Sequence, residues 1–378
     1  MKTIQKKLKT SDNREQALAE IQKLSPQLVL AFGSVNHFGP GGHATGLHDL
    51  FPEACVIGCS TAGEIANDGV YDDSFVVTAA HFSSSKMKTA LSPIKDMAGT
   101  LDAGVSIGRQ LNAPDLKAIF VLGRGLDING SALIQGIRDQ VGPQIIITGG
   151  LAGDAGQFKK TFTVLNQDVA HDRVVAFGIY GKSLEITFGS RGGWDAFGPI
   201  RTVTRSKANV LFELDGKPAL DIYKQYLGDK IKELPASGLL FPFQLLKDNQ
   251  DSLGLVRTIL SVDEKEKSLT LAGDIPQNGL VRLMHTTNEG LVAGAKSAAE
   301  LASPSNTSDS LGILISCVGR KIVMGVDVED ELEAVREVFK GTVLTGFYSY
   351  GEICPQDKFS PCSLHNQTMT ITCIREAA

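Results

Sequence analysis

The most constraining feature of this chain is a pattern that occurs three times. The segments are VIGCSTAGEI (56–65), IITGGLAGDA (146–155) and LTGFYSYGEI (344–353), and each joins an apolar run to a glycine followed by a carboxylate. The three acids are Glu64, Asp154 and Glu352. Glycine permits close backbone approaches, and a carboxylate beyond a strand end lies where open α/β sheets commonly bind ligands. The recurrence predicts an internal repeat with a shared cleft, although a single copy is explained as well by a solvated acid at a turn.

The length and the order of apolar segments predict a two-domain α/β protein. The chain has 378 residues, more than one ordinary core holds, and 42% of them are hydrophobic. Short strand-like runs alternate with helical spacing in the first half, so we expect mixed β-sheets flanked by helices. The segments 162–168 and 174–181 are predicted to be neighbouring antiparallel strands. We place an N-terminal extension at 1–24, a first domain at 25–225 and a second domain at 226–378.

Charge and composition exclude several classes of protein. The net charge is −5 and the isoelectric point about 5.8, so nothing favours nucleic-acid binding. The basic first ten residues lead into no apolar segment, and no apolar run approaches the roughly 20 residues of a membrane helix. We therefore expect a cytoplasmic protein with no membrane contact, whose six cysteines are mostly reduced.

Several long segments together resemble one family. These are GCSTAGEI, the run from SRGGW to LFELDGKPALDIYKQYLG, GFYSYGEI and the final LHNQTMT. They resemble the FIST family, an intracellular signal-transduction module with an N-terminal and a C-terminal FIST domain, over roughly residues 25–375. The resemblance implies a small-ligand sensor, not an enzyme, that acts through a partner such as a histidine kinase or a cyclic-dinucleotide enzyme. It leaves a homo-oligomer open.

The predicted ligand site lies where the first and third copies of the pattern face each other. Its residues are Ser60, Thr61, Glu64, Asp154, Trp194, Tyr348, Tyr350, Glu352 and Asn366. Other interpretations stay open. Ser60 and Thr61 could bond only to the backbone, and Trp194 could pack in a core or at a domain hinge.

Some stand-alone bacterial members of this family are nitric-oxide-sensing haem proteins, so the resemblance also implies a haem cofactor and a gas ligand. Haem needs an axial ligand, and His365 is the first choice, with His285 and His81 next. His365 could instead fix the last loop by hydrogen bonds. The spacing of Cys354, Cys362 and His365 departs from zinc patterns. The histidines at 37, 43 and 48 are expected near the surface.

Three alternatives accompany the haem sensor. An amino-acid or metabolite-binding module would use Glu64, Glu352, Ser60 and Asn366. A hydrolase would use Ser60 or Cys59, but GCSTAG has Ala62 where the nucleophile elbow has its second glycine. An interaction scaffold would bind a partner and no small ligand.

Overall fold

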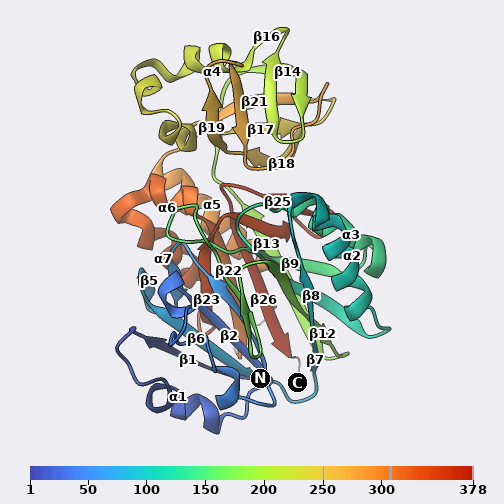
Figure 1. Ribbon diagram of the computed structural model, residues 1–378, viewed down its shortest axis with the longest axis vertical. Helices are drawn as coiled ribbons and strands as arrows, with labels where there is room; N and C mark the ends of the chain where they lie inside the picture. Colours follow the sequence, from blue (N-terminus) through green and yellow to red (C-terminus); the bar gives the residue numbers. More distant parts are fainter. Residues whose placement is uncertain (250, 306–308, 377–378) are drawn as a thin grey trace.

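The computed structural model describes residues 1–249, 251–305 and 309–376, and it has two parts (Figure 1). A large body carries both termini, and a smaller lobe, residues 195–285, stands on the opposite end of the body. The lobe is an insertion, because the chain enters it after Trp194 and returns to the body at Thr286. The body is therefore built from both ends of the sequence.

Within the described residues, the body contains three six-stranded sheets of one design. In each sheet two parallel strands lie beside an antiparallel strand that comes later in the chain. The first sheet has the order β1-β6-β2-β3-β10-β11, the second β25-β24-β9-β8-β12-β7, and the third β13-β26-β22-β23-β4-β5.

The strands of the body have the following bounds. In the first sheet they are β1 Lys2–Leu8, β2 Leu28–Gly33, β3 Cys55–Ser60, β6 Phe75–His81, β10 Thr163–Leu165 and β11 Asp168–Ala170. In the second they are β7 Lys86–Pro93, β8 Leu116–Gly123, β9 Ile146–Leu151, β12 Arg173–Tyr180, β24 Gly351–Pro355 and β25 Cys362–His365. In the third they are β4 Glu64–Ala66, β5 Gly69–Tyr71, β13 Leu184–Arg191, β22 Ser310–Cys317, β23 Val343–Ser349 and β26 Met369–Glu376.

The three sheets exchange hairpins in a cycle. The hairpin β4–β5 follows β3 but pairs with β23, β24–β25 follows β23 but pairs with β9, and β10–β11 follows β9 but pairs with β3. Each crossing begins in one copy of the repeated sequence pattern. The predicted internal repeat is thus confirmed. We call the three repeats units, one for each sheet, and each unit pairs a hairpin with the sheet of another unit.

The first glycine of each copy is required by close strand packing. A Cβ atom on Gly58 would lie 1.8 Å from the carbonyl oxygen of Ala31, and one on Gly346 would lie 1.7 Å from that of Leu314. Gly149 has the same relation to the neighbouring strand β8, at 1.8 Å. Real Cβ atoms do not approach an oxygen so closely, so these positions admit only glycine.

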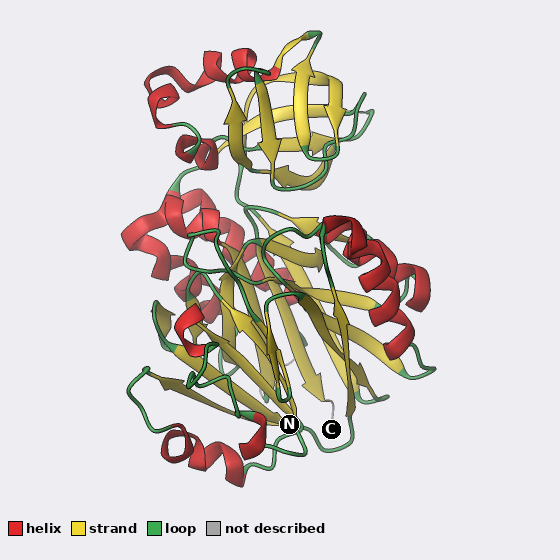
Figure 2. Ribbon diagram, viewed as in Figure 1, coloured by secondary structure: helices red, strands yellow, loops and turns green. Residues whose placement is uncertain are grey.

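The inner faces of the three sheets share one apolar core. Phe32 of β2 and Phe347 of β23 have ring centroids 4.8 Å apart, and Phe120 of β8 lies in the same buried cluster. Helices cover the outer faces, as Figure 2 shows. The helices of the body are α1 Arg14–Lys23, α2 Thr100–Leu111, α3 Gly130–Val141, α5 Asn288–Ala302, α6 Val318–Met324 and α7 Val328–Val338, and α4 Ala219–Leu227 belongs to the lobe. In the described part of the chain, no helix has the length and apolar character needed to cross a membrane.

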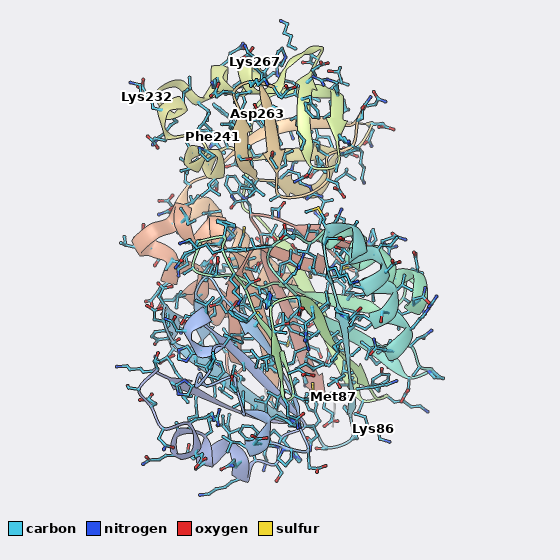
Figure 3. The ribbon with its side chains drawn as sticks, in the orientation of Figure 1. Lys86, Met87, Lys232, Phe241, Asp263 and Lys267 are labelled. Atoms are coloured by element: carbon cyan, nitrogen blue, oxygen red, sulfur yellow. The ribbon has the colours of Figure 1, made fainter. Side chains whose placement is uncertain are left out.

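The lobe has its own sheet and its own core. Its strands are β14 Asp195–Lys207, β15 Val210–Leu214, β16 Lys217–Pro218, β17 Phe243–Leu246, β18 Ser252–Arg257, β19 Ile259–Asp263, β20 Ser268–Leu271 and β21 Leu280–His285. Tyr223 of α4 packs with Phe243 inside it. Figure 3 labels Lys232, Phe241, Asp263 and Lys267 in the lobe, and Lys86 and Met87 at the far end of the body.

The predicted α/β class with mixed sheets and flanking helices is confirmed. The pairing predicted for segments 162–168 and 174–181 is wrong. Asn166, with a φ of 54°, turns the first segment into the hairpin β10–β11 on β3, whereas β12 pairs with β7 and β8 in another sheet. The division at 225/226 stays a prediction, and that boundary lies inside α4 of the lobe.

Candidate functional site

The three copies of the repeated pattern meet at the carboxyl ends of β3, β9 and β23. The backbone of Ala62 donates to the carbonyl of Tyr348 at 2.9 Å, and Tyr348 donates to Gly63 at 2.8 Å. Gly153 donates to the carbonyl of Ser60 at 2.8 Å. The predicted meeting of the first and third copies is therefore present, and the second copy joins them.

Glu64 is the acid of the first copy, and it is buried with only hydroxyl and backbone partners. One oxygen accepts from Thr61 Oγ1 at 2.5 Å, and the other accepts from the N–H and the hydroxyl of Ser74 at 3.1 and 2.8 Å. Burial raises the pKa of Glu64 to about 7, although these hydrogen bonds oppose the rise. Among the described residues, no cationic side chain lies within ion-pair distance of Glu64.

A cleft of about 440 Å³ opens beside Glu64, and we name it the Glu64 cleft. It is lined by Ser34, Thr61, Ala62, Gly63, Glu64, Asp72, Asp73, Ala155, Val318, Lys321, Ile322 and Gly325. The ammonium of Lys321 donates to the carbonyl of Ala62 at 3.0 Å and pairs with Asp72. The hydroxyl of Ser34 is buried and has no hydrogen-bond partner among the residues the structure describes. The cleft thus offers a buried acid, a cation and a free hydroxyl.

Glu352 repeats the Glu64 arrangement in the third copy. Its oxygens accept from the Ser349 hydroxyl at 2.9 Å and from the N–H and hydroxyl of Thr368 at 3.2 and 2.9 Å. Its side chain is fully buried, and burial raises its pKa to about 8. Unlike Glu64, Glu352 lines none of the described clefts. The equivalent carboxyl group therefore faces a cleft in the first copy of the pattern and is enclosed in the third copy.

Asp154 differs from the other two acids. Its carboxylate accepts from the N–H groups of residues 158–160 and from the hydroxyl of Tyr350. Burial opposes its ionisation, but these hydrogen bonds outweigh burial and lower its pKa. Thr163, and not Asp154, occupies the position that is equivalent to Glu64. Thr163 pairs with Cys59 of β3, just as Glu64 pairs with Phe347 of β23. Asp154 therefore closes a loop, with Phe158 stacked on Tyr350 at 4.3 Å.

The two nucleophile candidates of the hydrolase alternative are enclosed. The hydroxyl of Ser60 donates to the carbonyl of Gly153 at 2.7 Å and accepts from the N–H of Phe162 at 2.8 Å. Burial raises the pKa of the Cys59 thiol well above its usual value. These contacts favour the interpretation in which Ser60 joins the second copy of the pattern to the first.

His365, the first choice for a haem ligand, is enclosed and hydrogen-bonded in this structure. Its Nε2 donates to the carbonyl of Cys354 at 2.8 Å, and its ring is fully buried. Burial lowers its pKa to about 4, and the nearby guanidiniums of Arg257 and Arg191 add to the effect. The remaining nitrogen, Nδ1, has no hydrogen-bond partner among the residues that the structure describes, and His365 does not line the Glu64 cleft. Within the described ranges, no three His, Cys, Asp or Glu side chains are placed to hold a metal ion.

Trp194 and Asn366 lie at the junction between the body and the lobe. The Trp194 indole donates to the carbonyl of Gln367 at 2.9 Å, and the amide of Gln367 reaches the carbonyl of Leu239 in the lobe at 3.2 Å. Asn366 is 1% exposed, and its Oδ1 has no partner within the described residues. These contacts favour the hinge interpretation of Trp194, and neither residue lines the Glu64 cleft.

The polar cleft residues that have no place in the sequence prediction are Ser34, Asp72, Asp73 and Lys321. Ser34 directly follows β2, which is parallel to β3, so a search of neighbouring strand ends would have found it. Lys321 comes from α6, far along the chain, and no local pattern marks it.

The expectation of surface histidines in the loop after β2 is wrong. His37 is fully buried and its Nδ1 lies 2.8 Å from that of His43, while both rings stack on Phe75. Burial, with the neighbouring His43, lowers the pKa of His37 to about 4. The glycine-rich loop folds inward because these aromatic contacts close the end of the first sheet.

Sequence models of two domains match the chain: the FIST N domain over residues 27–217 and the FIST C domain over residues 219–355. A protein of Methanocaldococcus jannaschii, described as uncharacterized protein MJ1623, is 26% identical, with 59% of this chain and 48% of that protein covered. The chain thus spans about half the length of this curated relative. A crystal structure of cyanuric acid hydrolase from A. caulinodans is similar over 100% of this chain and 99% of that chain, at 9% identity and a TM-score of 0.39.

Proposed function

Because the chain belongs to the FIST family, a family of signal-transduction sensors, we propose that it binds a small ligand in the Glu64 cleft. The ligand we propose carries an ammonium group beside a carboxylate, as a free amino acid does. The volume of about 440 Å³ lies within the roughly 300–1,000 Å³ of small-molecule sites.

The observation that carries the proposal is the buried carboxyl of Glu64 beside an open cleft. A buried carboxylate normally has a cationic partner, since an unpaired charge is costly to bury. Glu64 has three donors but no cation within the described residues, and its raised pKa reflects that deficit. A ligand ammonium would supply the missing charge and bring Glu64 into its ionised form.

Lys321 and Ser34 suit the other end of such a ligand. The Lys321 ammonium lines the same cleft, and a carboxylate could share it with Asp72. The Ser34 hydroxyl has no partner in the described structure and can donate to the same carboxylate. The cleft therefore combines a site for each charge of a zwitterion.

The test is a calorimetric titration of the full chain with amino acids, with the amines that lack the carboxylate, and with the acids that lack the amine. We expect only the zwitterions to bind tightly. Glu64→Gln should weaken binding about tenfold or more, because it removes a charge-assisted hydrogen bond. Glu300→Gln on the exposed face of α5 is the matched control. Equal affinity of Glu64→Gln and the parent protein would refute the proposal.

Haem-dependent nitric oxide sensing is a second proposal, and it rests on the family resemblance alone. It requires the enclosed Nδ1 of His365 to become accessible to the iron, whereas the Nε2 hydrogen bond to Cys354 could remain. Haemin titration of the full chain, followed by reduction and nitric oxide, tests it. A one-to-one Soret band that shifts with the gas and changes in His365→Ala would support haem, and a broad band without fixed stoichiometry would refute it.

We also propose that the sensor acts on a partner enzyme. A histidine kinase or a cyclic-dinucleotide enzyme would respond to the liganded state, because a ligand that prefers one conformation shifts the population toward it. Co-purification with and without a bound amino acid tests whether any such partner depends on the ligand.

A further inference from the structure

A second cleft, of about 190 Å³, lies between the body and the lobe, away from the Glu64 cleft. The body contributes α3 and β25, and the lobe contributes β18 through Leu255 and Arg257. Two of the lining residues are arginines, Arg138 and Arg257, and none is acidic. We name this cavity the junction cleft.

Arg257 is a buried cation that has no ion-pair partner within the described part of the chain. It is 3% exposed and donates hydrogen bonds to the backbone carbonyls of Asp274, Val256 and Leu364 at 3.0–3.3 Å. The carboxylate of Asp274 attracts it from beyond ion-pair distance and accepts from Asn129 instead. Burial lowers the pKa of Arg257 to about 10, so the guanidinium stays charged at neutral pH. In the described structure a buried positive charge thus faces a cavity uncompensated.

Arg138 brings a second positive charge from the opposite wall. It lies in the last turn of α3, is half-buried, and has no carboxylate within ion-pair distance in the described residues. Ser131 and Gln135 of the same helix and Ser363 of β25 add polar side chains to the lining, of which the Gln135 amide also donates to Asp139 and the Ser363 hydroxyl to the carbonyl of Pro361. The two arginines therefore carry the charge of the cleft, one from the body and one from the lobe.

We propose that the junction cleft binds a phosphoryl group, either of inorganic phosphate or of a small phosphorylated metabolite. Guanidinium groups bind phosphate oxygens through paired hydrogen bonds, and a tetrahedral dianion can accept from several directions at once. The volume is below that of a drug-sized ligand site and corresponds to about six waters, at about 30 Å³ each, which suits one such group. This proposal is independent of what binds the Glu64 cleft.

Binding at this position would connect the lobe to the body. Arg257 belongs to the lobe and already donates to Leu364 of β25, next to His365. An anion held by Arg257 and Arg138 together would add a second link between the two parts. The ligand would therefore favour the lobe position seen here, which makes the site regulatory.

The test is a calorimetric titration of the full chain with inorganic phosphate at low salt, with malonate as the carboxylate comparison. We expect saturable one-to-one phosphate binding that weakens about tenfold or more in Arg138→Gln, because one charge-assisted contact is lost. Arg257→Lys, which keeps the charge, should weaken it less than Arg257→Met. Arg109→Gln on α2, whose side chain contacts Gln140, is the matched control.

Hydrogen exchange supplies a second measurement. Phosphate should protect residues 252–257 and 362–365, which line the cleft from its two sides, while leaving the termini unchanged. Absence of saturable phosphate binding in the parent protein would overturn the proposal. So would undiminished affinity in Arg138→Gln, a substitution that removes no side-chain hydrogen bond or ion pair within the described residues. Tighter binding of malonate than of phosphate would overturn the phosphoryl assignment.

Discussion

Replacing Glu64 with glutamine should stabilise the fold at neutral pH and weaken ligand binding at the same time. Burial raises the pKa of Glu64 from 4.5 to about 7. A rise of about two and a half pH units, at about 1.4 kcal/mol each, means that the ionised side chain costs about 3 kcal/mol of folding free energy. Glutamine has the same shape and no charge, so it avoids this cost and keeps acceptors for Ser74.

The sign of the pH dependence follows from the order in which the two states ionise. Below pH 4.5 Glu64 is protonated in both the folded and the unfolded chain, and it favours neither. Between pH 4.5 and about 7 the unfolded chain loses its proton first, so stability falls as pH rises. Above pH 7 the full cost remains. Ligand affinity has the opposite trend, and it should fall about tenfold per pH unit below 7 as Glu64 takes up a proton.

The assay is urea unfolding at pH 5, 6, 7 and 8 for the parent protein, Glu64→Gln and the exposed control Glu300→Gln. We expect Glu64→Gln to gain up to about 3 kcal/mol at pH 8 and almost nothing at pH 5. The amino-acid titrations of the same proteins should show the loss of affinity. A variant that is destabilised equally at every pH would refute the reasoning, because it would show that Glu64 serves the fold as an ion.

Three further predictions concern the fold and the hinge. Gly346→Ala would place a Cβ atom 1.7 Å from a carbonyl oxygen of the neighbouring strand, so we expect a loss of about 3 kcal/mol or more in urea unfolding. Arg320→Met leaves the fully buried Glu331, now paired at 2.7 Å, without its cation, and we expect a loss of about 3–5 kcal/mol by the same measurement. Trp194→Phe removes the hydrogen bond to Gln367 at 2.9 Å, so it should cost about 1 kcal/mol and speed hydrogen exchange at 366–368.

The first two predictions have a control variant, and the third has an outcome that would contradict it. Gly39→Ala meets nothing within 4 Å and should leave the urea midpoint unchanged. The double variant Arg320→Met with Glu331→Leu should recover much of the loss, since it removes both charges together. Unchanged exchange at 366–368 in Trp194→Phe would contradict the hinge interpretation.

Much of the fold was predictable because apolar runs and glycines are local signals. The short strand-like runs expected in the first half became β2, β3, β6, β8 and β9, which are apolar and bounded by turn residues. The repeated glycine-carboxylate pattern also predicted that its copies would meet. By contrast, β24 and β25 were not predicted as strands. They lie in a segment that contains proline and cysteine residues and has no alternation of apolar and polar residues.

Glu64 and Thr61, two of the predicted ligand residues, line the Glu64 cleft because the pattern itself places them just beyond the end of β3. That they bind a ligand stays a prediction. Lys321 was missed because it reaches the cleft from another unit. Tyr350, predicted as a ligand residue, instead donates to the Asp154 carboxylate, and Glu352 is enclosed. The positions of Lys321, Tyr350 and Glu352 depend on which repeats of the body are neighbours in the tertiary structure.

The sequence by itself determined the α/β class, the family and the threefold recurrence of an acid after a strand. These features follow from the residue types and their spacing along the chain, so they can be recognised without the tertiary structure. Only the tertiary structure decided that hairpins exchange between units, that the lobe is inserted above the third unit, and that one acid faces a cleft while its counterpart is enclosed. The physical reason is that burial, and with it the pKa of a carboxyl group, depends on neighbours that are hundreds of residues away in the chain.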